Sequence, residues 1–203
     1  MRLEVAKKDQ YRRLARERGY KSRAAFKLLE TVRKYRLIKE GDVVLDFGAA
    51  PGGWLQVAAE AVGPGGLVVG IDLEPIDLDE VNLVAIQSDI KSPGLSLKLE
   101  KAMPRKADVL LSDLAPQVIG TWDIDHFRQA ELTMVAIDLM GGFLERGGNA
   151  MFKVFDGERF GEVRALLSKR FETVHVTKPK ASRTQSAELY LVCLGYRGSS
   201  PHP

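Results

Sequence analysis

Three acidic residues stand at or just beyond the ends of apolar segments in this 203-residue chain: Asp46, Asp72 and Asp89. If these segments are parallel strands of an open α/β sheet, their carboxyl ends meet at the edge where such sheets bind ligands. A carboxylate at Asp72 can accept both ribose hydroxyls of an adenosine, and one at Asp89 can accept from an adenine amino group. Any single one of these acids could equally be a helix cap or a surface turn. Three in succession predict an adenosine-bearing ligand.

A glycine-rich turn follows the first of these acids, in Asp46-Phe-Gly48-Ala-Ala-Pro-Gly52-Gly53-Trp54. Glycines let a backbone approach a ligand closely, and the amides at a helix start face it. The turn does not have the G-x-G-x-x-G pattern, which argues against a pyrophosphate cofactor and a nicotinamide oxidoreductase. Acids such as Asp46 and Asp113 would instead suit a cationic sulfonium.

A lysine interrupts the apolar segment Met151-Phe-Lys153-Val-Phe. Burying its charge without a partner would cost several kcal/mol, so we expect acidic partners, and Glu188 could hold the ammonium in place. A partly buried lysine can take the proton of a weak nucleophile such as a hydroxyl, because burial lowers the pKa of an amine. The alternative is an edge lysine whose ammonium reaches solvent.

The elements that must position these residues alternate between strands and helices. The spacing predicts two helices before the sheet, the second capped by Ser22, and then a single α/β domain over residues 1–203 with helices on both faces of a seven-stranded, mostly parallel sheet. No helix fits between the last two strands, so they should form an antiparallel hairpin at one edge. The predicted helices are 10–18, 23–36, 53–62, 123–145 and 159–170, and the predicted strands are 43–47, 67–72, 83–87, 107–113, 149–155, 171–177 and 187–195.

Charge is distributed unevenly along the chain. Residues 1–40 carry a balance of +9 and the remainder a balance of −6, which together give the net charge of +3. A basic N-terminal arm on an acidic body is typical of a protein that binds a nucleic-acid backbone, although a solvated helix face or a disordered tail would show the same bias. Tyr11 and Tyr20 could stack on bases. The candidate RNA-binding residues are Arg12, Arg13, Arg16, Lys21 and Arg23 in the arm and Lys178, Lys180 and Arg183 near the C-terminus.

Composition excludes several other classes. No run of about 18 apolar residues is present and the N-terminus is charged, so we expect a soluble, cytoplasmic protein with no membrane segment. The single cysteine, Cys193, lies in an apolar run and is interpreted as a core residue. The three histidines are too scattered for a metal site, and none is predicted.

Four motifs in order resemble the FtsJ-type 2′-O-ribose RNA methyltransferases, the ribosomal RNA large-subunit methyltransferase E group. They are the turn 46–54, Ser112-Asp-Leu-Ala-Pro116, Lys153-Val-Phe-Asp-Gly157 and Ser186-Ala-Glu-Leu-Tyr190, and the similarity runs from about residue 9 to residue 196. The resemblance implies the Rossmann-like class I methyltransferase fold and S-adenosylmethionine as cofactor, with the family's contacts at Gly52, Trp54, Asp72, Asp89 and Asp113. The strand end and the glycine-rich turn add Asp46, Gly48 and Gly53 as cofactor-binding candidates. It also implies a catalytic tetrad of Lys27, Asp113, Lys153 and Glu188.

In this interpretation Lys153 activates a ribose hydroxyl, Asp113 and Glu188 set its charge state and position, and Lys27 orients the ribose or neutralises developing charge. The implied substrate is a uridine of large-subunit ribosomal RNA, free or within the subunit, and the implied enzyme is a monomer. A tRNA anticodon-loop methyltransferase and a non-catalytic RNA assembly factor remain as alternatives. One motif departs from the family: Gln117-Val-Ile-Gly120 stands where an Asn-x-Ser-Gly pattern is expected.

Overall fold

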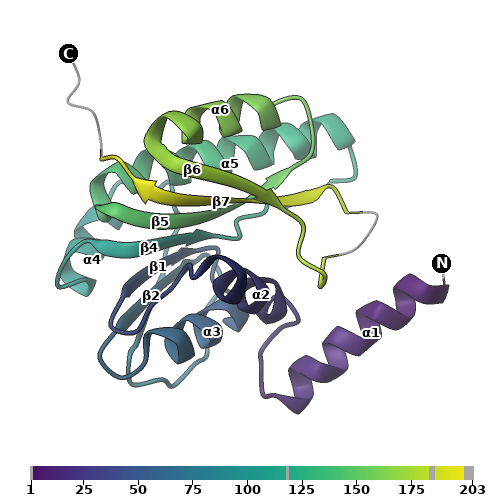
Figure 1. Cartoon of the computed structure of the whole chain (residues 1–203), viewed down its shortest axis with the longest axis horizontal. Coiled ribbons are helices and arrows are strands. Elements are labelled where there is room, and N and C mark those ends of the chain that lie inside the picture. The colour runs from purple at the N-terminus through teal and green to yellow at the C-terminus, as the bar shows by residue number, and fades with distance from the viewer. Residues whose placement is uncertain (1, 118, 183–185, 199–203) are drawn as a thin grey trace.

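The computed structural model describes residues 2–117, 119–182 and 186–198 (Figure 1). The helices are α1 (Arg2–Glu17), α2 (Ala25–Tyr35), α3 (Gly53–Val62), α4 (Leu95–Ala102), α5 (Trp122–Phe143) and α6 (Phe160–Arg170). The strands are β1 (Val43–Phe47), β2 (Leu67–Asp72), β3 (Leu83–Gln87), β4 (Ala107–Ser112), β5 (Leu144–Phe155), β6 (Phe171–Thr177) and β7 (Glu188–Tyr196).

The strands form one seven-stranded sheet in the order β3-β2-β1-β4-β5-β7-β6. The pairs from β3 to β5 are parallel, whereas β7 runs antiparallel to both of its neighbours, β5 and β6. The predicted hairpin at the edge is therefore confirmed, and within it β7 lies inside while β6 forms the edge. This arrangement places the start of β7 against the end of β5, with Glu188 opposite Phe155.

Two hydrophobic layers bury the two faces of the sheet. On one face α2 and α3 pack over side chains such as Val44, Leu111 and Met151. On the other face α5, α6 and α4 cover side chains such as Leu45, Leu110 and Phe152 (Figure 1). Neighbouring strand residues point to opposite faces, so the same strands supply both layers. The predicted helices on both faces are confirmed.

The N-terminal helix α1 extends away from the sheet and joins the body through an aromatic cluster (Figure 1). The rings of Tyr11 and Tyr20 lie 5.5 Å and 5.8 Å from the ring of Phe26 on α2, and the Tyr20 hydroxyl donates to Glu60. The predicted availability of these two tyrosines for stacking on bases is thus reduced, because both rings pack against α2.

Several local predictions differ from the structure. Helix α1 begins at Arg2 and not at residue 10, and β5 begins at Leu144, inside the predicted helix 123–145 and before the predicted strand start at residue 149. Ser22 does not cap α2: the residue before the helix is Ala24, with no side-chain cap, and Ser22 instead packs beside Gly53. Helix α4 is absent from the predicted elements. It is only eight residues long and follows Ser92-Pro-Gly94, a sequence typical of a turn, so too few apolar residues repeat for a helical pattern to be recognised. Burial of Leu95 and Leu99 against the sheet supplies the stabilisation that local propensity does not.

Candidate active site

Two lysine–acid pairs lie at the carboxyl edge of the sheet. Lys27 projects from α2 and donates to Glu188 Oε2 at 2.9 Å, a pair that joins residues 161 positions apart. Lys153 lies near the end of β5, and its ammonium is 3.2 Å from Asp113 Oδ1. It also donates to the Asp113 main-chain oxygen at 2.5 Å. Both lysines are buried, with exposed fractions of 6% and 5%, so each charge is neutralised where water cannot screen it.

The strand directions explain this convergence. Asp113 directly follows β4, which is parallel to β5, so their carboxyl ends lie side by side. Glu188 begins the antiparallel strand β7, and its start therefore meets the same edge. Because side chains alternate along β7, Tyr190 points to the same face as Glu188.

Tyr190 joins the two pairs. Its hydroxyl accepts from Lys27 Nζ at 2.9 Å and donates to Asp113 Oδ1 at 3.2 Å. The Lys27 ammonium also lies 5.4 Å from the centre of the tyrosine ring, within the range of a cation–π contact. The sequence motif includes this tyrosine, but sequence reasoning assigns it no role. Its position two residues after Glu188 on a strand is the signal that could have found it.

The charge states follow from burial and from these contacts. Burial alone would raise the pKa of Glu188, but the charge of Lys27 and its hydrogen bond outweigh burial and lower that pKa below its ordinary value. Burial, and then the negative charges of Asp113 and Glu188, raise the pKa of Tyr190 well above its ordinary value. The phenol therefore keeps its hydrogen and donates it to Asp113.

The contacts correct one predicted pairing. Glu188 is predicted to hold the Lys153 ammonium, but in the described residues its ion-pair partner is Lys27, and Asp113 takes the place beside Lys153. The charge of Lys153 still acts on Glu188 by lowering its pKa, as a secondary contribution. Tyr190 fills the space between the two pairs, which is why Glu188 reaches α2 instead.

A cavity of about 240 Å³ lies beside Asp113, at the ends of β1, β2 and β4. Four predicted cofactor residues line it: Gly48, Asp72, Asp89 and Asp113. Asp72 accepts from the main-chain N–H groups of Ala50 and Glu74, and a carboxylate has further lone pairs for ribose hydroxyls. Apolar residues that sequence reasoning missed, Ile71, Leu114 and Leu132 among them, complete the lining.

Asp46 lies buried at the end of β1, with no exposed surface. Neither of its carboxylate oxygens has a hydrogen-bond partner within the part of the chain that the structure describes. Burial, and then the negative charges of Asp113 and Asp72, raise its pKa well above the ordinary value. An unpaired buried acid costs free energy, and a cationic ligand or a hydrogen-bond donor would remove that cost. This acid therefore fits a cofactor that carries positive charge.

Gly52, Gly53 and Trp54 lie outside this cavity and shape the turn around it. Gly52 has a φ of 108°, and a Cβ there would lie 2.5 Å from Leu78, so only glycine fits without strain. Trp54 is buried, and its indole N–H donates to the Ala24 carbonyl on the side of α2. These three residues position the turn between β1 and α3, and no described contact assigns them a ligand.

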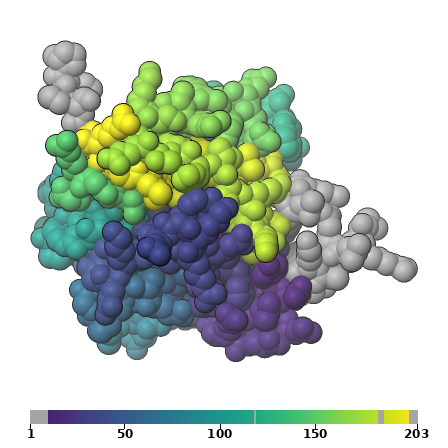
Figure 2. All heavy atoms as spheres, viewed as in Figure 1, coloured from purple at the N-terminus to yellow at the C-terminus, as the bar shows by residue number. Residues whose placement is uncertain are grey.

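The predicted RNA-binding residues lie on two segments that approach each other. Lys180 in the segment after β6 donates its main-chain N–H to Glu30 on α2. Figure 2 shows α2 across the middle of this face of the molecule, with α1 and the segment after β6 on either side of its end. The two basic segments therefore border the same part of the surface.

The individual basic side chains differ in their contacts. Arg12 and Arg16 are exposed, Arg13 pairs with Glu17, and Lys21 pairs with Asp77. Arg23 is half-buried, and its positive charge offsets a minor part of the rise that burial causes in the pKa of Tyr190. Lys178 donates to the Ser186 carbonyl. Arg183 lies outside the described residues.

The departing motif after Asp113 is held by a carboxylate in the first turn of α5. The Asp125 carboxylate on α5 accepts from the main-chain N–H groups of Ile119 and Gly120, both at 3.0 Å. Gly120 has a φ of 86°, which favours the glycine that the motif retains. The loop that carries Asp113 is therefore fixed to α5 without the family's polar residues.

Neither a metal site nor a membrane span is found in the described residues. No group of three or more His, Cys, Asp or Glu side chains there could hold a metal ion. None of the described helices combines the length and apolar character needed to cross a bilayer. Cys193 is buried on β7 and packs in the core, as predicted, and burial raises the pKa of its thiol.

The fold and this site together define a class I methyltransferase: a seven-stranded sheet with an inserted antiparallel strand, an acid-lined cavity at the ends of its first strands and a lysine-based centre beside it. Comparison with known proteins narrows the class. The FtsJ-like methyltransferase family matches residues 20–196, and the chain belongs to this family.

The comparisons extend over nearly the whole chain. A ribosomal RNA large subunit methyltransferase E from Cenarchaeum symbiosum is 49% identical over 199 residues, which are 98% of this chain and 100% of that protein. A crystal structure from Plasmodium falciparum, described as a ribosomal RNA methyltransferase, is 33% identical with a TM-score of 0.80 and covers 89% of this chain and 100% of that one. Fibrillarin from Aeropyrum pernix shares the fold, at 18% identity and a TM-score of 0.58 over 78% of this chain and 68% of that one. The predicted fold, family and enzyme class, a methyltransferase that uses S-adenosylmethionine, are confirmed.

Proposed function

We propose that the chain transfers a methyl group from S-adenosylmethionine to a ribose 2′-hydroxyl of RNA, at a uridine of large-subunit ribosomal RNA. The observation that carries the proposal is the placement of two buried lysine–acid pairs, joined by Tyr190, beside the acid-lined cavity. Relatives named ribosomal RNA large subunit methyltransferase E support the choice of RNA.

The cofactor supplies an electrophilic methyl group when it is bound. Asp72 and Asp89 would hold its adenosine, because both line the cavity and both have carboxylate lone pairs in excess of their main-chain contacts. Asp46, at the end of β1, would offset the positive charge of the cofactor. Asp113 lies where this cavity meets the lysine pairs, so it can act on both sides.

The lysine pairs would act on the hydroxyl. A ribose hydroxyl is a weak nucleophile, so the site must align it with the methyl group and take its proton. In this proposal Lys153 reacts as a neutral amine, after its ammonium has released one proton to water. The amine receives the hydroxyl proton as the methyl group moves from sulfur to oxygen, and Asp113 fixes the amine at that position. Lys27, held by Glu188 and Tyr190, orients the ribose and offsets negative charge on the oxygen.

RNA would reach the site along the basic arm. The exposed side chains of α1 and the lysines after β6 lie on either side of the end of α2, which carries Lys27 (Figure 2). Such basic segments bind the RNA backbone without reading its bases. We propose further that the chain is one catalytic domain with this arm as its RNA-binding extension, and that it acts as a monomer in the cytoplasm.

The test is direct methylation with a defined acceptor. Purified protein and radiolabelled S-adenosylmethionine are incubated with large-subunit ribosomal RNA, with assembled large subunits and with tRNA, and the methylated position is mapped by its resistance to alkaline cleavage. A substrate with a 2′-deoxynucleotide at the mapped position should accept no methyl group. Methylation that persists on this substrate would place the product on a base and overturn the proposed chemistry.

A further inference from the structure

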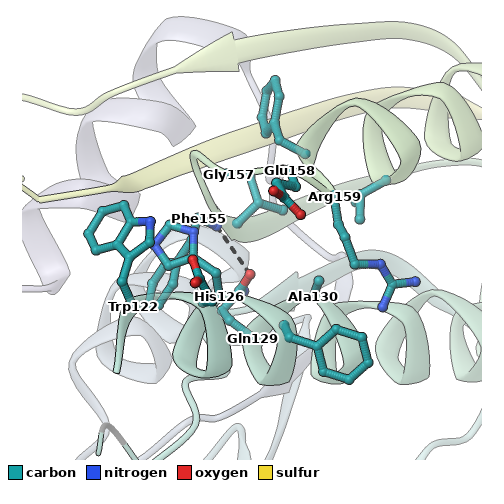
Figure 3. A pocket seen from close by; sticks show the side chains of 13 residues that line it. Trp122, His126, Gln129, Ala130, Phe155, Gly157, Glu158 and Arg159 are labelled. Carbon is teal, nitrogen blue, oxygen red and sulfur yellow. Dashed lines mark hydrogen bonds between the residues drawn. The ribbon is translucent and has the colours of Figure 1, made fainter. Parts of the chain in front are cut away.

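A second cavity, of about 510 Å³, lies between the start of α5 and the turn that joins β5 to α6 (Figure 3). Its volume falls within the range of small-ligand sites. The proposed methyl transfer uses none of its residues. Its lining combines aromatic rings with a few polar groups: Trp122, His126 and Phe127 on α5, Phe155 at the end of β5, and Gln129 and Arg159.

The aromatic rings are unusually exposed for their size. Trp122 is 62% exposed and Phe127 is 52% exposed, whereas the solvent-facing positions of a helix usually carry polar residues. Ile119 and Ile124, close to Trp122 in the sequence, are also exposed, at 54% and 43%. An exposed apolar surface around a cavity indicates a binding site.

Three tilted aromatic rings pack together at one end of the cavity. The centres of the Trp122 and His126 rings are 4.0 Å apart, with 33° between their planes, and Phe155 lies 5.2 Å beyond His126. At the other end Arg159 lies over the ring of Phe127 at 5.3 Å (Figure 3). Flat faces of this kind suit a flat ligand, because offset stacking is the preferred contact between aromatic rings.

The imidazole of His126 is held by packing and not by hydrogen bonds. Both of its ring nitrogens are enclosed, and neither has a hydrogen-bond partner within the described ranges of the chain. A Cβ at Gly157 would lie 2.3 Å from His126 Nδ1, so glycine is needed for the ring to lie there. A buried polar group without a partner is unfavourable, and the packing of Gly157 and the neighbouring rings holds the imidazole there at that cost.

Gln129 connects this cavity to Lys153, the proposed proton acceptor. Its amide donates to the Lys153 carbonyl at 2.7 Å. The same amide accepts from the Phe155 main-chain N–H at 3.1 Å (Figure 3). The cavity wall therefore includes Val154 and Phe155, the two residues that follow Lys153 on β5, and Phe155 is about 7 Å from Lys153 along the strand. A chain molecule whose reacting group sits at Lys153 can place its next unit in the cavity.

We infer that this cavity binds one unpaired base of the RNA substrate, from a nucleotide adjacent to the one whose ribose is methylated. The inference rests on the proposed function for its choice of RNA. Proteins recognise single-stranded RNA by stacking splayed bases on aromatic side chains and on arginine, and by hydrogen bonds to the base edges. Trp122 provides the stacking face, while Arg159 provides hydrogen-bonding groups. Arg159 spends two of its nitrogens on Glu162 and has further N–H groups for a base edge or phosphate.

The test compares Trp122→Ala, Trp122→Phe and Phe127→Ala with Leu97→Ala, a matched control at an equally exposed apolar residue on α4. RNA affinity is measured by fluorescence anisotropy with an oligonucleotide around the mapped methylation site. A second series of oligonucleotides lacks the base at one flanking position at a time. Affinity for S-adenosylmethionine and the thermal unfolding midpoint verify that each variant folds.

Trp122→Ala should weaken RNA binding by about 5- to 150-fold, the cost of one base–aromatic stack, whereas Trp122→Phe should recover most of it. Wild type and Trp122→Ala should bind one abasic RNA with equal affinity, the one that lacks the base proposed to occupy the cavity. On every other abasic RNA the variant should still bind more weakly than wild type. An unchanged RNA affinity in Trp122→Ala overturns the inference. The inference is also overturned if the variant binds every abasic RNA more weakly than wild type by the same factor. A wild-type dimer that Trp122→Ala dissociates would make the cavity a protein interface instead. Because binding is measured without methyl transfer, an inactive wild type would count against the proposed function alone.

Discussion

The hydroxyl of Tyr190 lies 3.2 Å from Asp113 Oδ1 and donates a hydrogen bond to it. The phenol oxygen also accepts from Lys27 at 2.9 Å, so one side chain connects the pair Lys27–Glu188 with the pair Lys153–Asp113. Hydrogen bonds in such a buried network depend on one another, because each fixes the donor or acceptor of the next. A change at any member is therefore expected to affect both lysines, but to different extents.

Replacing Tyr190 by Phe tests the connection itself. The ring should keep its packing against Trp54, while Lys27 and Asp113 each lose one partner. We expect the free energy of unfolding to fall by about 1–3 kcal/mol and methyl transfer to fall only partly. Urea unfolding and initial rates measure the two effects. A variant as inactive as Lys153→Ala would contradict the connecting role and make the phenol essential.

Replacing Lys153 tests the proposed proton acceptor. Lys153→Ala should fold and bind S-adenosylmethionine but lose about 10²- to 10⁴-fold in methyl transfer, the usual contribution of a positioned acid or base. Lys153→Arg keeps the positive charge beside Asp113 but cannot readily accept a proton. If proton transfer is its role, the arginine variant should be nearly as inactive as the alanine variant. Single-turnover rates separate this from binding, and Lys169→Ala on α6 serves as an exposed control. Full activity in Lys153→Ala would refute the site.

Glu188→Gln should reveal the lowered pKa of Glu188 as a pH-dependent loss of stability. Because Lys27 lowers that pKa in the folded chain, the ion pair stabilises the protein above the unfolded-state value near 4.5, and this stabilisation is lost as the pH falls through the folded-state pKa. The variant should be less stable than wild type by about 1–3 kcal/mol at pH 7. This difference should shrink below pH 4.5. Denaturant unfolding from about pH 3 to 8 measures it, and a difference that is constant with pH would exclude the linkage.

Asp46→Asn should change the free energy of unfolding at pH 7 in the opposite direction to Glu188→Gln. The pKa of Asp46 is raised, so folding favours its protonated form, and the folded chain loses stability as the pH rises from the unfolded-state value toward the folded-state one. In the absence of ligand the asparagine variant should therefore be more stable than wild type at pH 7 by at least about 1 kcal/mol, with little difference near pH 3.5.

The same variant tests the cofactor role of Asp46. If Asp46 offsets positive charge, Asp46→Asn should bind S-adenosylmethionine more weakly than wild type does. The substitution should weaken binding of the demethylated product less, because that product is an uncharged thioether. Calorimetry with both ligands decides. An equal loss for the two would assign Asp46 to the shape of the turn and not to the sulfonium.

Neutralising the exposed arm should alter the salt dependence of RNA binding. Arg12, Arg13 and Arg16 lie on α1, away from the cofactor cavity. Changing all three to Ala should leave S-adenosylmethionine affinity unchanged and make the slope of log K against log salt shallower by up to about 2, at roughly 0.7 per phosphate contact. Fluorescence anisotropy at several salt concentrations measures the slope. An unchanged slope would show that α1 does not contact the RNA.

The sequence by itself determined the sheet and the positions of its functional residues along the chain. Strand ends, glycine-rich turns and the alternation of elements are local features set by backbone sterics and side-chain period, so these patterns alone suffice to assign Asp72, Asp113 and Lys153 to strand ends. The motif order led to the family for the same reason. Helix α4 was not predicted because it is too short for a helical repeat of apolar residues to be recognised.

Tertiary structure decided which of these residues act on one another. Glu188 binds Lys27, and not Lys153, because β7 inserts between β5 and β6 and brings its first residues under α2. Tyr190 and the aromatic cavity at Trp122 likewise depend on how α2 and α5 pack over opposite faces of the sheet. Contacts between residues up to 163 positions apart are fixed by packing of the whole domain, and no local pattern in the sequence encodes them.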